Sequence, residues 1–363
     1  MTCNHTRGRT TRSGFTLVEL MVAMALSLGI MVILTEAFKM SLEFTSHSGS
    51  TGRLIAQLDA AEMVLRRDLH ADHFLVSADT PGQTGKLIDQ RLDKLTNTLT
   101  GWVPPPGGFF QIHSTPPYFE VNDRDSLAIT TATNHSLHFT VIYPGGSEDG
   151  FFTATVPPGS NNVYRSRAAE VAYFLVPMQG SPRTSQDGNG RPLYNLIRRQ
   201  RLVALTADDR AALSPALSQP GVGNVISTAG GQINTLHDVQ IPARRLSFAP
   251  GLGGDLGNGD DIVVSNVLSF QVLVDWDRNS NPPVAAFLRG VQNPRPFVIN
   301  TDFPYDHLWQ GGGPSGSPWL FDTYAPTLDR ISQAIRVKSL QISLRIFDPS
   351  TKMARQNTWV FTP

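Results

Sequence analysis

Residues 12–38 read RSGFTLVELMVAMALSLGIMVILTEAF, and this stretch decides how the rest of the chain can be organised. Only Glu19 and Glu36 are charged between residues 15 and 38, and no charged residue lies between Leu20 and Leu34. As an α-helix, residues 15–38 span about 36 Å at about 1.5 Å per residue, which is enough to cross the hydrocarbon core of a bilayer. The stretch therefore predicts a membrane-spanning helix close to the N-terminus.

The segment before this helix is basic. Residues 1–14 contain Arg7, Arg9 and Arg12 and no acidic residue. Positive charge beside a membrane span favours the cytoplasmic side. The pattern therefore predicts a single-pass protein with a cytoplasmic N-terminus and with its C-terminal part on the other side of the membrane.

Two ordinary kinds of N-terminal segment compete with a specialised one. A conventional signal peptide needs a cleavage site of small residues after the apolar core, and TEAFKMS at 35–41 is a poor one. A plain membrane anchor does not explain Glu19, since a carboxylate deep in a bilayer costs about 2.5–3.5 kcal/mol on insertion scales. An acid at this position indicates a functional residue.

The run from Arg12 to Leu20, RSGFTLVEL, resembles the class III signal of type IV pilins and type II secretion pseudopilins. In that family a prepilin peptidase cuts after the glycine that ends a short basic leader, and then N-methylates the new first residue. The resemblance implies cleavage between Gly14 and Phe15 and methylation of Phe15. It also implies that Glu19, the fifth mature residue, pairs with the N-terminal amine of a neighbouring subunit.

The physical chemistry of the segment agrees with this interpretation. Cleavage creates a cation at Phe15 in or near the membrane, and an acid such as Glu19 offsets the desolvation of such a charge on a neighbour. Loss of the leader also removes its three Arg and Cys3, which leaves 27 basic and 30 acidic residues, a formal charge of −3 and no cysteine. The mature chain needs no disulfide to fold.

Residues 39–75 predict an amphipathic extension of the same helix. Gly49 and Gly52, together with neighbouring serines, are weak helix formers, so we expect a kink or local loosening there. The apolar residues beyond them recur every three or four positions and mark one helical face: Leu54, Leu58, Ala61, Leu65 and Leu69. This face predicts packing against a sheet.

The end of this helix carries a second, shorter resemblance. Arg67-Asp68-Leu69 is similar to a motif near the end of the long helix in minor pilins of the GspJ and PilW type. Major pilins often have a proline where this chain has Glu36, so its absence fits a minor component. The presence of Glu19 argues against a GspK-type tip subunit.

Residues 76–363 predict a β-rich globular head. Alternating apolar and polar residues indicate strands at 127–131, 137–143, 151–156, 169–177, 193–205, 261–275, 336–348 and 357–361. Strands and helices do not alternate, so we expect antiparallel pairing, with SQDGNGRP at 185–192 as a turn. The remaining length is expected in loops at 80–120, 206–260 and 278–330. The fold class is α+β: a long N-terminal helix, its first half spanning the membrane, packed on a mostly antiparallel sheet.

The order of the predicted strands adds to the family resemblance. Val171–Leu175, a polar turn and Leu196–Arg199 look like a GspJ-type hairpin, and 267–272 and 335–347 resemble its later strands. The head is larger than a typical GspJ head, and PilW-like proteins are longer, which suits 363 residues.

Motifs that carry catalysis or cofactors are missing from the sequence. It contains no G-x-S-x-G, H-E-x-x-H, Walker A or G-x-G-x-x-G pattern, and GLGGDLGNG at 251–259 is expected to be a flexible loop. We expect no enzyme, cofactor or metal, and the 30 basic and 30 acidic residues exclude a strongly basic nucleic-acid binder.

Three weaker patterns are open to two interpretations. Histidines at 70 and 73 and at 135 and 138 are expected to be surface or packing residues rather than metal ligands. Asp275 and Asp277 begin a run of alternating oxygen ligands that suits calcium, but Ser280 replaces the expected glycine and we favour a turn at a strand end, with calcium binding as the open alternative. Trp309 and Trp319 flank GGGPSGSP and are expected to pack locally rather than to mark a binding surface.

These observations favour a minor pilin or pseudopilin, a structural subunit of a type II secretion pseudopilus or a type IV pilus. The expected partners are other pilin-like subunits through the N-terminal helix, prepilin peptidase and the inner-membrane assembly platform, without nucleic acid. The expected organisation is a cleaved leader at 1–14, a transmembrane and assembly helix at 15–38, an amphipathic extension at 39–75 and a periplasmic head at 76–363. The alternative is a membrane-anchored extracytoplasmic binding module that is not built into a filament.

Overall fold

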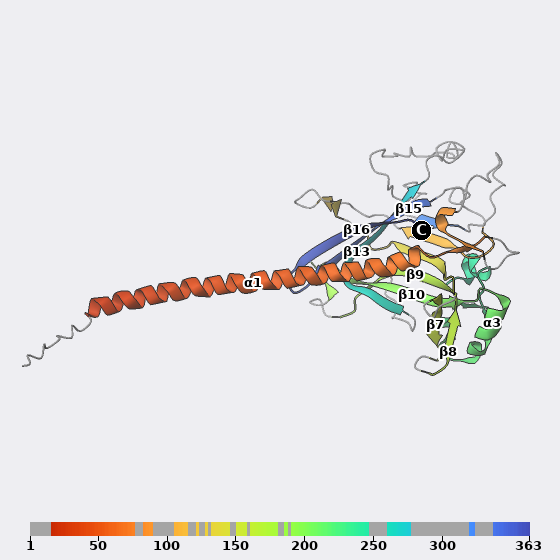
Figure 1. Ribbon diagram of the computed structural model, residues 1–363, viewed down its shortest axis with the longest axis horizontal. Coiled ribbons are helices and arrows are strands. Elements are labelled where there is room, and N and C mark those ends of the chain that lie inside the picture. The colour runs from red at the N-terminus through yellow and green to blue at the C-terminus, as the bar shows by residue number, and fades with distance from the viewer. Residues whose placement is uncertain are drawn as a thin grey trace, which may run out of the picture. The chain divides into compact units, whose positions relative to one another are not determined.

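The structure is a computed structural model that describes residues 16–76, 83–89, 105–114, 121–122, 128–129, 132–145, 150–157, 160–180, 185–187, 190–246, 260–276, 319–323 and 337–363. The chain divides into two compact units, residues 1–53 and 54–363. A single long helix, α1 (Leu17–Leu69), contributes to both units, and the strands lie in the second (Figure 1). The α+β fold predicted from the sequence, a long apolar helix followed by a mostly antiparallel sheet, is confirmed.

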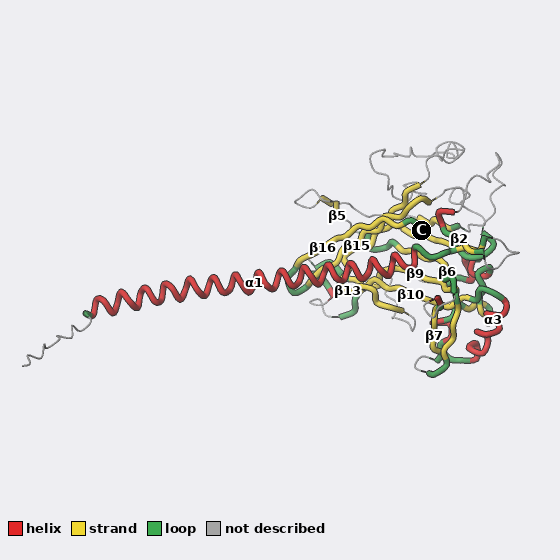
Figure 2. The backbone as a smooth tube through the Cα atoms, in the orientation of Figure 1, coloured by secondary structure: helices red, strands yellow, loops and turns green. Residues whose placement is uncertain are grey.

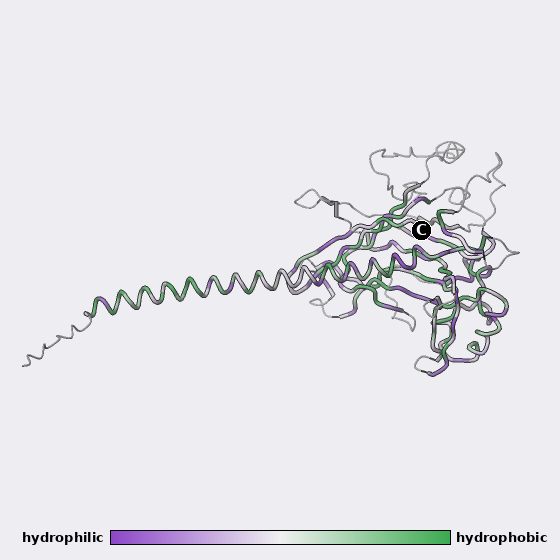
Figure 3. The backbone as a smooth tube through the Cα atoms, in the orientation of Figure 1, coloured by the Kyte–Doolittle hydropathy of each residue, from purple (hydrophilic) through white to green (hydrophobic). Residues whose placement is uncertain are grey.

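The first unit is the apolar part of α1. Residues Leu17–Leu42 form a segment of 26 residues with a mean hydropathy of 2.5, long and apolar enough to cross a membrane (Figure 3). The backbone stays helical through Gly49 and Gly52, so the loosening expected there is not present. A glycine costs only about 1 kcal/mol in a helix interior, and helix propagation from both sides offsets this cost.

The second unit is built on an eight-stranded sheet in the order β14-β3-β6-β9-β10-β13-β15-β16 (Figure 2). All seven neighbouring pairs are antiparallel. The strands are β3 (Phe110–Ser114), β6 (Ser136–Ile142), β9 (Ala168–Pro177), β10 (Tyr194–Val203), β13 (Asp260–Trp276), β14 (Trp319–Asp322), β15 (Val337–Asp348) and β16 (Met353–Phe361). Six of these strands confirm the sequence predictions to within a few residues.

The centre of the sheet is a regular hairpin of β9 and β10, paired from Tyr194↔Pro177 to Val203↔Ala168. The predicted turn at 185–192 is confirmed where it is described. The backbone N–H of Arg191 donates to Oδ1 of Asp187 at 2.8 Å, and Gly190 has φ of +78°, which glycine adopts without strain. β6 and β9 are buried on both faces; β9 is a nearly continuous apolar run, whereas β6 alternates apolar residues with the buried Ser136, His138 and Thr140.

All three expected loop regions contain structure, since β14 lies within the expected loop 278–330. β3 lies within the expected loop 80–120, and residues 207–246 form a folded insert instead of a loop. The insert contains α3 (Ala207–Leu213), η4 (Ser214–Ser218), α4 (Val222–Val225), β11 (Thr228–Ala229), β12 (Gln232–Ile233), η5 (Asp238–Gln240) and η6 (Pro242–Arg244). A capping box of Thr206 and Asp209 starts α3, and Leu213, Ala216 and Val225 reach the core. These elements are too short for periodicity to reveal.

The remaining short elements surround the sheet. They are β1 (Phe74–Leu75), β2 (Thr84–Gly85), η1 (Leu87–Asp89), β4 (Val121–Asn122), β5 (Ala128–Ile129), β7 (Phe152–Thr155) and β8 (Val163–Ser166). β7 and β8 pair as a hairpin and lie beside α3 at one end of the head (Figure 1). β5 and β7 occupy the predicted strands at 127–131 and 151–156.

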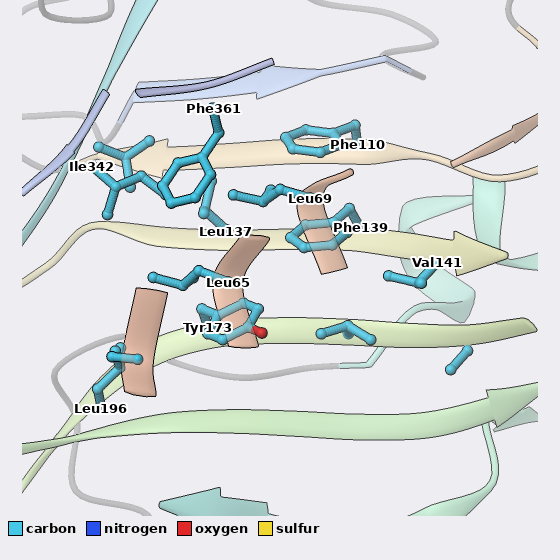
Figure 4. Packing of buried hydrophobic residues seen from close by; sticks show 14 of the residues in the cluster. Leu65, Leu69, Phe110, Leu137, Phe139, Val141, Tyr173, Leu196, Ile342 and Phe361 are labelled. Atoms are coloured by element: carbon cyan, nitrogen blue, oxygen red, sulfur yellow. The ribbon is translucent and has the colours of Figure 1, made fainter. Parts of the chain in front are cut away.

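The core of the head forms where α1 packs on one face of the sheet. All five residues of the predicted helical stripe are buried, with Leu54 at 4% and the others at 1% exposure or less. Figure 4 shows Leu65 and Leu69 among Phe110, Phe139 and Tyr173, which β3, β6 and β9 contribute. Burial of each leucine stabilises the fold by about 1.5–3 kcal/mol, so the stripe holds the helix on the sheet.

Candidate functional site

The helix that carries the predicted assembly residues begins with a capping box. α1 starts at Leu17, and the side chains of Thr16 and Glu19 bond reciprocally across its first turn. The backbone N–H of Thr16 donates to Oε2 of Glu19 at 2.9 Å, and the backbone N–H of Glu19 lies 3.3 Å from Oγ1 of Thr16. The Thr16 hydroxyl also donates to Oε2 at 3.1 Å. The Glu19 carboxylate and the Thr16 hydroxyl therefore each satisfy one backbone N–H group at the helix start that would otherwise lack a partner.

Sequence reasoning missed this contribution of Thr16. The spacing Thr-x-x-Glu in TLVE was the available signal, because a threonine followed three residues later by a glutamate is typical of a capping box. Gly14 and Phe15, the predicted cleavage residues, lie outside the described residues.

The side chains of residues 17–42 are exposed throughout the first unit. None of the most apolar window of this helix is buried, and Leu17 and Phe38 are 77% and 67% exposed. The hydroxyl of Thr35 donates to the carbonyl of Met31 at 2.7 Å, which satisfies a polar group within the helix itself. A continuous apolar surface of this size needs lipid or other helices to cover it.

The second unit contains a polar network at the end of α1, centred on Asp68. This carboxylate is completely buried and accepts hydrogen bonds from Nε of Arg198 at 2.6 Å and from the hydroxyl of Tyr173 at 2.7 Å. Its other oxygen lies 3.4 Å from the Tyr143 hydroxyl and 3.2 Å from Nε of Arg67. Asp68 thus joins α1 to β9, to β10 and to the residue after β6.

The electrostatics of this network favour its charged form. Burial by itself lowers the pKa of Arg198, but the Asp68 carboxylate and Tyr173 outweigh burial and raise it. Burial and then the charge of Asp68 raise the pKa of Tyr173 well above its usual range and that of Tyr143 to about 12. Both phenols therefore remain protonated donors, and Arg198 remains a cation, at any physiological pH.

A second buried network lies on the other face of the sheet and holds the insert 207–246. Glu170 accepts hydrogen bonds from the backbone N–H of Leu246 at 2.6 Å and from the Ser227 hydroxyl at 2.8 Å, and lies 2.8 Å from Nε2 of His138. Burial raises the pKa of Glu170, but the bonds from His138, Leu246 and Ser227 more than offset this and lower it. Asn234 extends the network by donating to Ser227 at 3.0 Å.

Of the other histidines singled out in the sequence, two are buried and one is exposed. His73 is buried, with Nδ1 2.7 Å from the carbonyl of Thr140 and Nε2 3.3 Å from that of Leu69. His135 accepts from the backbone N–H of Val272 at 3.1 Å, and His70 is exposed. Within the described ranges no group of three or more His, Cys, Asp or Glu is placed to hold a metal.

Several predictions fall on residues that the structure does not describe. The backbone of Asp275 lies in β13, one residue before its end, but the side chain of Asp275 and all of Asp277 lie outside the described residues, as do 251–259 and Trp309. Trp319 begins β14, and its side chain is likewise outside.

Comparison with protein families matches residues 9–35 to the prokaryotic N-terminal methylation motif. No curated protein and no solved structure matches the chain. The chain carries a prepilin-type cleavage and methylation signal, which supports a type IV pilin-like protein that prepilin peptidase processes. The signal and the apolar helix fit a single-pass inner-membrane anchor that assembles with other pilin subunits.

Proposed function

We propose that the protein is a minor pilin or pseudopilin, a structural subunit of a type II secretion pseudopilus or a type IV pilus. The observation that carries the proposal is the methylation motif at 9–35 together with a helix whose apolar residues, through Leu42, are exposed. In this role the protein is a building block and not an enzyme. The head, anchored to α1 by Asp68, is the part it presents outside the membrane.

Processing acts at the start of the helix. Prepilin peptidase cuts between Gly14 and Phe15 and methylates Phe15, so the mature chain begins one residue before the capping residue Thr16. The chain is then organised as leader 1–14, transmembrane and assembly helix 15–38, helix extension 39–75 and head 76–363. The N-terminus faces the cytoplasm and the head faces the periplasm until the subunit enters the filament.

Assembly draws on two separate interactions of the helix. Burial of the exposed apolar side chains of residues 17–42 against neighbouring helices supplies most of the free energy. Glu19 pairs with the N-terminal amine of a neighbouring subunit and sets register more than strength, since desolvation of both groups offsets much of their attraction. Before assembly, the bonds from Thr16 reduce the cost of holding this carboxylate in the membrane.

The subtype that we favour is the GspJ- or PilW-like minor pilin. Arg67-Asp68-Leu69 ends the helix, and Asp68 bonds to the central hairpin of β9 and β10. The partners are other pilin-like subunits, the peptidase and the inner-membrane assembly platform.

Variants of Glu19 test the assembly role. Glutamine can replace glutamate in a capping box, so Glu19→Gln removes the charge while preserving the helix start, whereas Glu19→Ala removes both. We expect both variants to keep a folded head and to fail to enter filaments, measured by shearing and immunoblotting of surface or overproduced filaments. Glu36→Gln, at the other end of the apolar segment, is the matched control and should assemble normally. Normal incorporation of Glu19→Gln would contradict the proposed charge pair.

A further inference from the structure

The contact between α1 and the sheet has a repetitive apolar part and a unique polar part. The stripe of Leu54, Leu58, Ala61, Leu65 and Leu69 recurs every three or four residues. A displacement by one turn, about 5.4 Å, would bring Leu69 to the place of Leu65 and Leu58 to that of Leu54. The same displacement would bring Glu62 to the place of Leu58 and Leu65 to that of Ala61, so the stripe opposes it at these two places, while leucines would still fill the places of Leu54 and Leu65.

The polar part permits only one register. Asp68 is the residue of α1 whose carboxylate meets Arg198 and Tyr173, and both of these are almost completely buried. A displacement in one direction would bring Val64 to Arg198 and leave the guanidinium without its counter-ion. A buried charge that loses its partner is strongly destabilising, whereas a buried pair replaced by apolar residues is often tolerated.

A displacement in the other direction would bring Asp72 toward Arg198. Asp72 is held in place after the helix, because its carbonyl accepts from the backbone N–H of Ile142 at 2.7 Å and its carboxylate bonds to the Thr84 hydroxyl. Asp68 and Asp72 thus oppose displacement in both directions.

We propose that Asp68 and Arg198 are positioning residues that fix the register of α1 on the sheet, and thereby decide which side chains of residues 54–69 remain exposed for a neighbouring pilin-like subunit. Ile55 and Met63, 38% and 74% exposed, are the apolar residues that this register presents. The register itself is a property of the head; its consequence for assembly rests on the proposed function.

Cross-linking in the full-length chain tests the register directly. The only natural cysteine is Cys3, which Cys3→Ser removes. The Arg66 guanidinium lies 5.2 Å from the centre of the Phe361 ring, so Thr362→Cys provides a fixed partner beside it. A second cysteine is placed at position 66, which reports the observed register, or at 62 or 70, which report the two displaced registers. The protein is treated with a short bifunctional thiol reagent in detergent micelles.

With the polar network intact, cross-linking through position 66 should exceed that through 62 or 70 by at least about tenfold. The triple variant Asp68→Leu, Arg198→Met, Tyr173→Phe should keep a cooperative thermal transition and reduce this preference to about threefold or less. The single variant Arg198→Lys, which keeps the charge opposite Asp68, should retain the single register. Leu65→Ala should lower the melting temperature without broadening the pattern.

A triple variant that retains the full preference for position 66 would overturn the proposal, as would a broadened pattern in Leu65→Ala. Filament incorporation is measured in parallel, so that a failure of the proposed function can be distinguished from a failure of the positioning role. If the wild-type chain never enters filaments but the register responds as stated, only the proposed function fails. If the wild-type chain assembles and the register does not respond, only the positioning role fails.

Discussion

Oδ2 of Asp68 accepts a hydrogen bond from Nε of Arg198 at 2.6 Å, and the two residues are 0% and 3% exposed. They lie 130 positions apart in the chain, on α1 and on β10. This pair links α1 to the sheet through opposite charges, and it makes the stability of the head sensitive to single changes at either residue.

Removing one partner of this pair should be much more damaging than replacing the whole network. Asp68→Ala leaves the Arg198 guanidinium buried without a counter-ion and should lower the free energy of unfolding by about 3–5 kcal/mol. Urea denaturation followed by tryptophan fluorescence measures this. Asp59→Ala, on the exposed face of the same helix, is the control and should change it by less than about 0.5 kcal/mol. A loss below about 1 kcal/mol for Asp68→Ala would contradict the account of the network.

The buried imidazole of His73 predicts a loss of stability in mild acid. Burial lowers its pKa below the usual value of about 6.5, and this outweighs the hydrogen bonds to Thr140 and Leu69 that raise it. As the pH falls through about 6.5, the unfolded chain therefore takes up a proton that the folded chain does not, and stability decreases. The urea midpoint should be lower at about pH 5.5 than at about pH 7.5.

His73→Gln separates this residue from the other histidines. The variant should be less stable at neutral pH but should show a smaller decrease between the two pH values, because His70 and His113, whose pKa values burial also lowers, remain. An unchanged pH dependence in His73→Gln would exclude His73 as the source.

The carboxylate of Glu170 should hold the insert 207–246 on the sheet. Its lowered pKa means that it contributes stability above the unfolded pKa of about 4.5, and this contribution is lost as the pH falls through the lower folded value. Glu170→Gln removes the charge and one acceptor oxygen, so hydrogen exchange in residues 207–246 should accelerate at neutral pH more than in the strands. The same change at Glu62, a partly buried residue of α1 that is 26% exposed, is the control. Uniform acceleration across the whole head would show that Glu170 does not act locally on the insert.

We expect removal of the leader to require glycine at position 14 but not at position 8. Gly14→Glu should leave the leader attached, since the cleaved bond follows this residue, and the chain should migrate as the precursor on an immunoblot. Gly8→Glu places the same charge within the leader but away from the bond, and should be processed normally. A mature N-terminus at Phe15 in Gly14→Glu would refute the cleavage site.

Sequence patterns predicted most of the sheet because its strands are long and strongly apolar. β9 and β10 could be recognised from VAYFLVP and LIRRQRLV with a turn between them, and the stripe of α1 from its period. β3 was missed because it is a short strand that follows the prolines at 104–106, and the insert 207–246 because none of its elements exceeds seven residues.

The polar networks were less accessible to sequence reasoning. Arg67-Asp68-Leu69 drew attention to Asp68 only through a resemblance, although an acid between Leu65 and Leu69 stands on the buried face and so requires a partner. Nothing in the local sequence of β10 identifies Arg198, rather than Arg199 or Arg201, as that partner. The choice depends on which face of the strand meets α1, and this is a property of the assembled sheet.

The account depends most directly on how the chain begins after processing. N-terminal mass spectrometry of the protein purified from the membranes of its own host measures this. We predict a chain that starts with N-methylated Phe15, because the methylation motif matches residues 9–35, a span that contains Gly14 and Phe15. A chain that still begins at Met1 would indicate a plain single-span anchor. A chain that begins beyond residue 38 would indicate cleavage of a conventional signal peptide. Either result would contradict the pilin account.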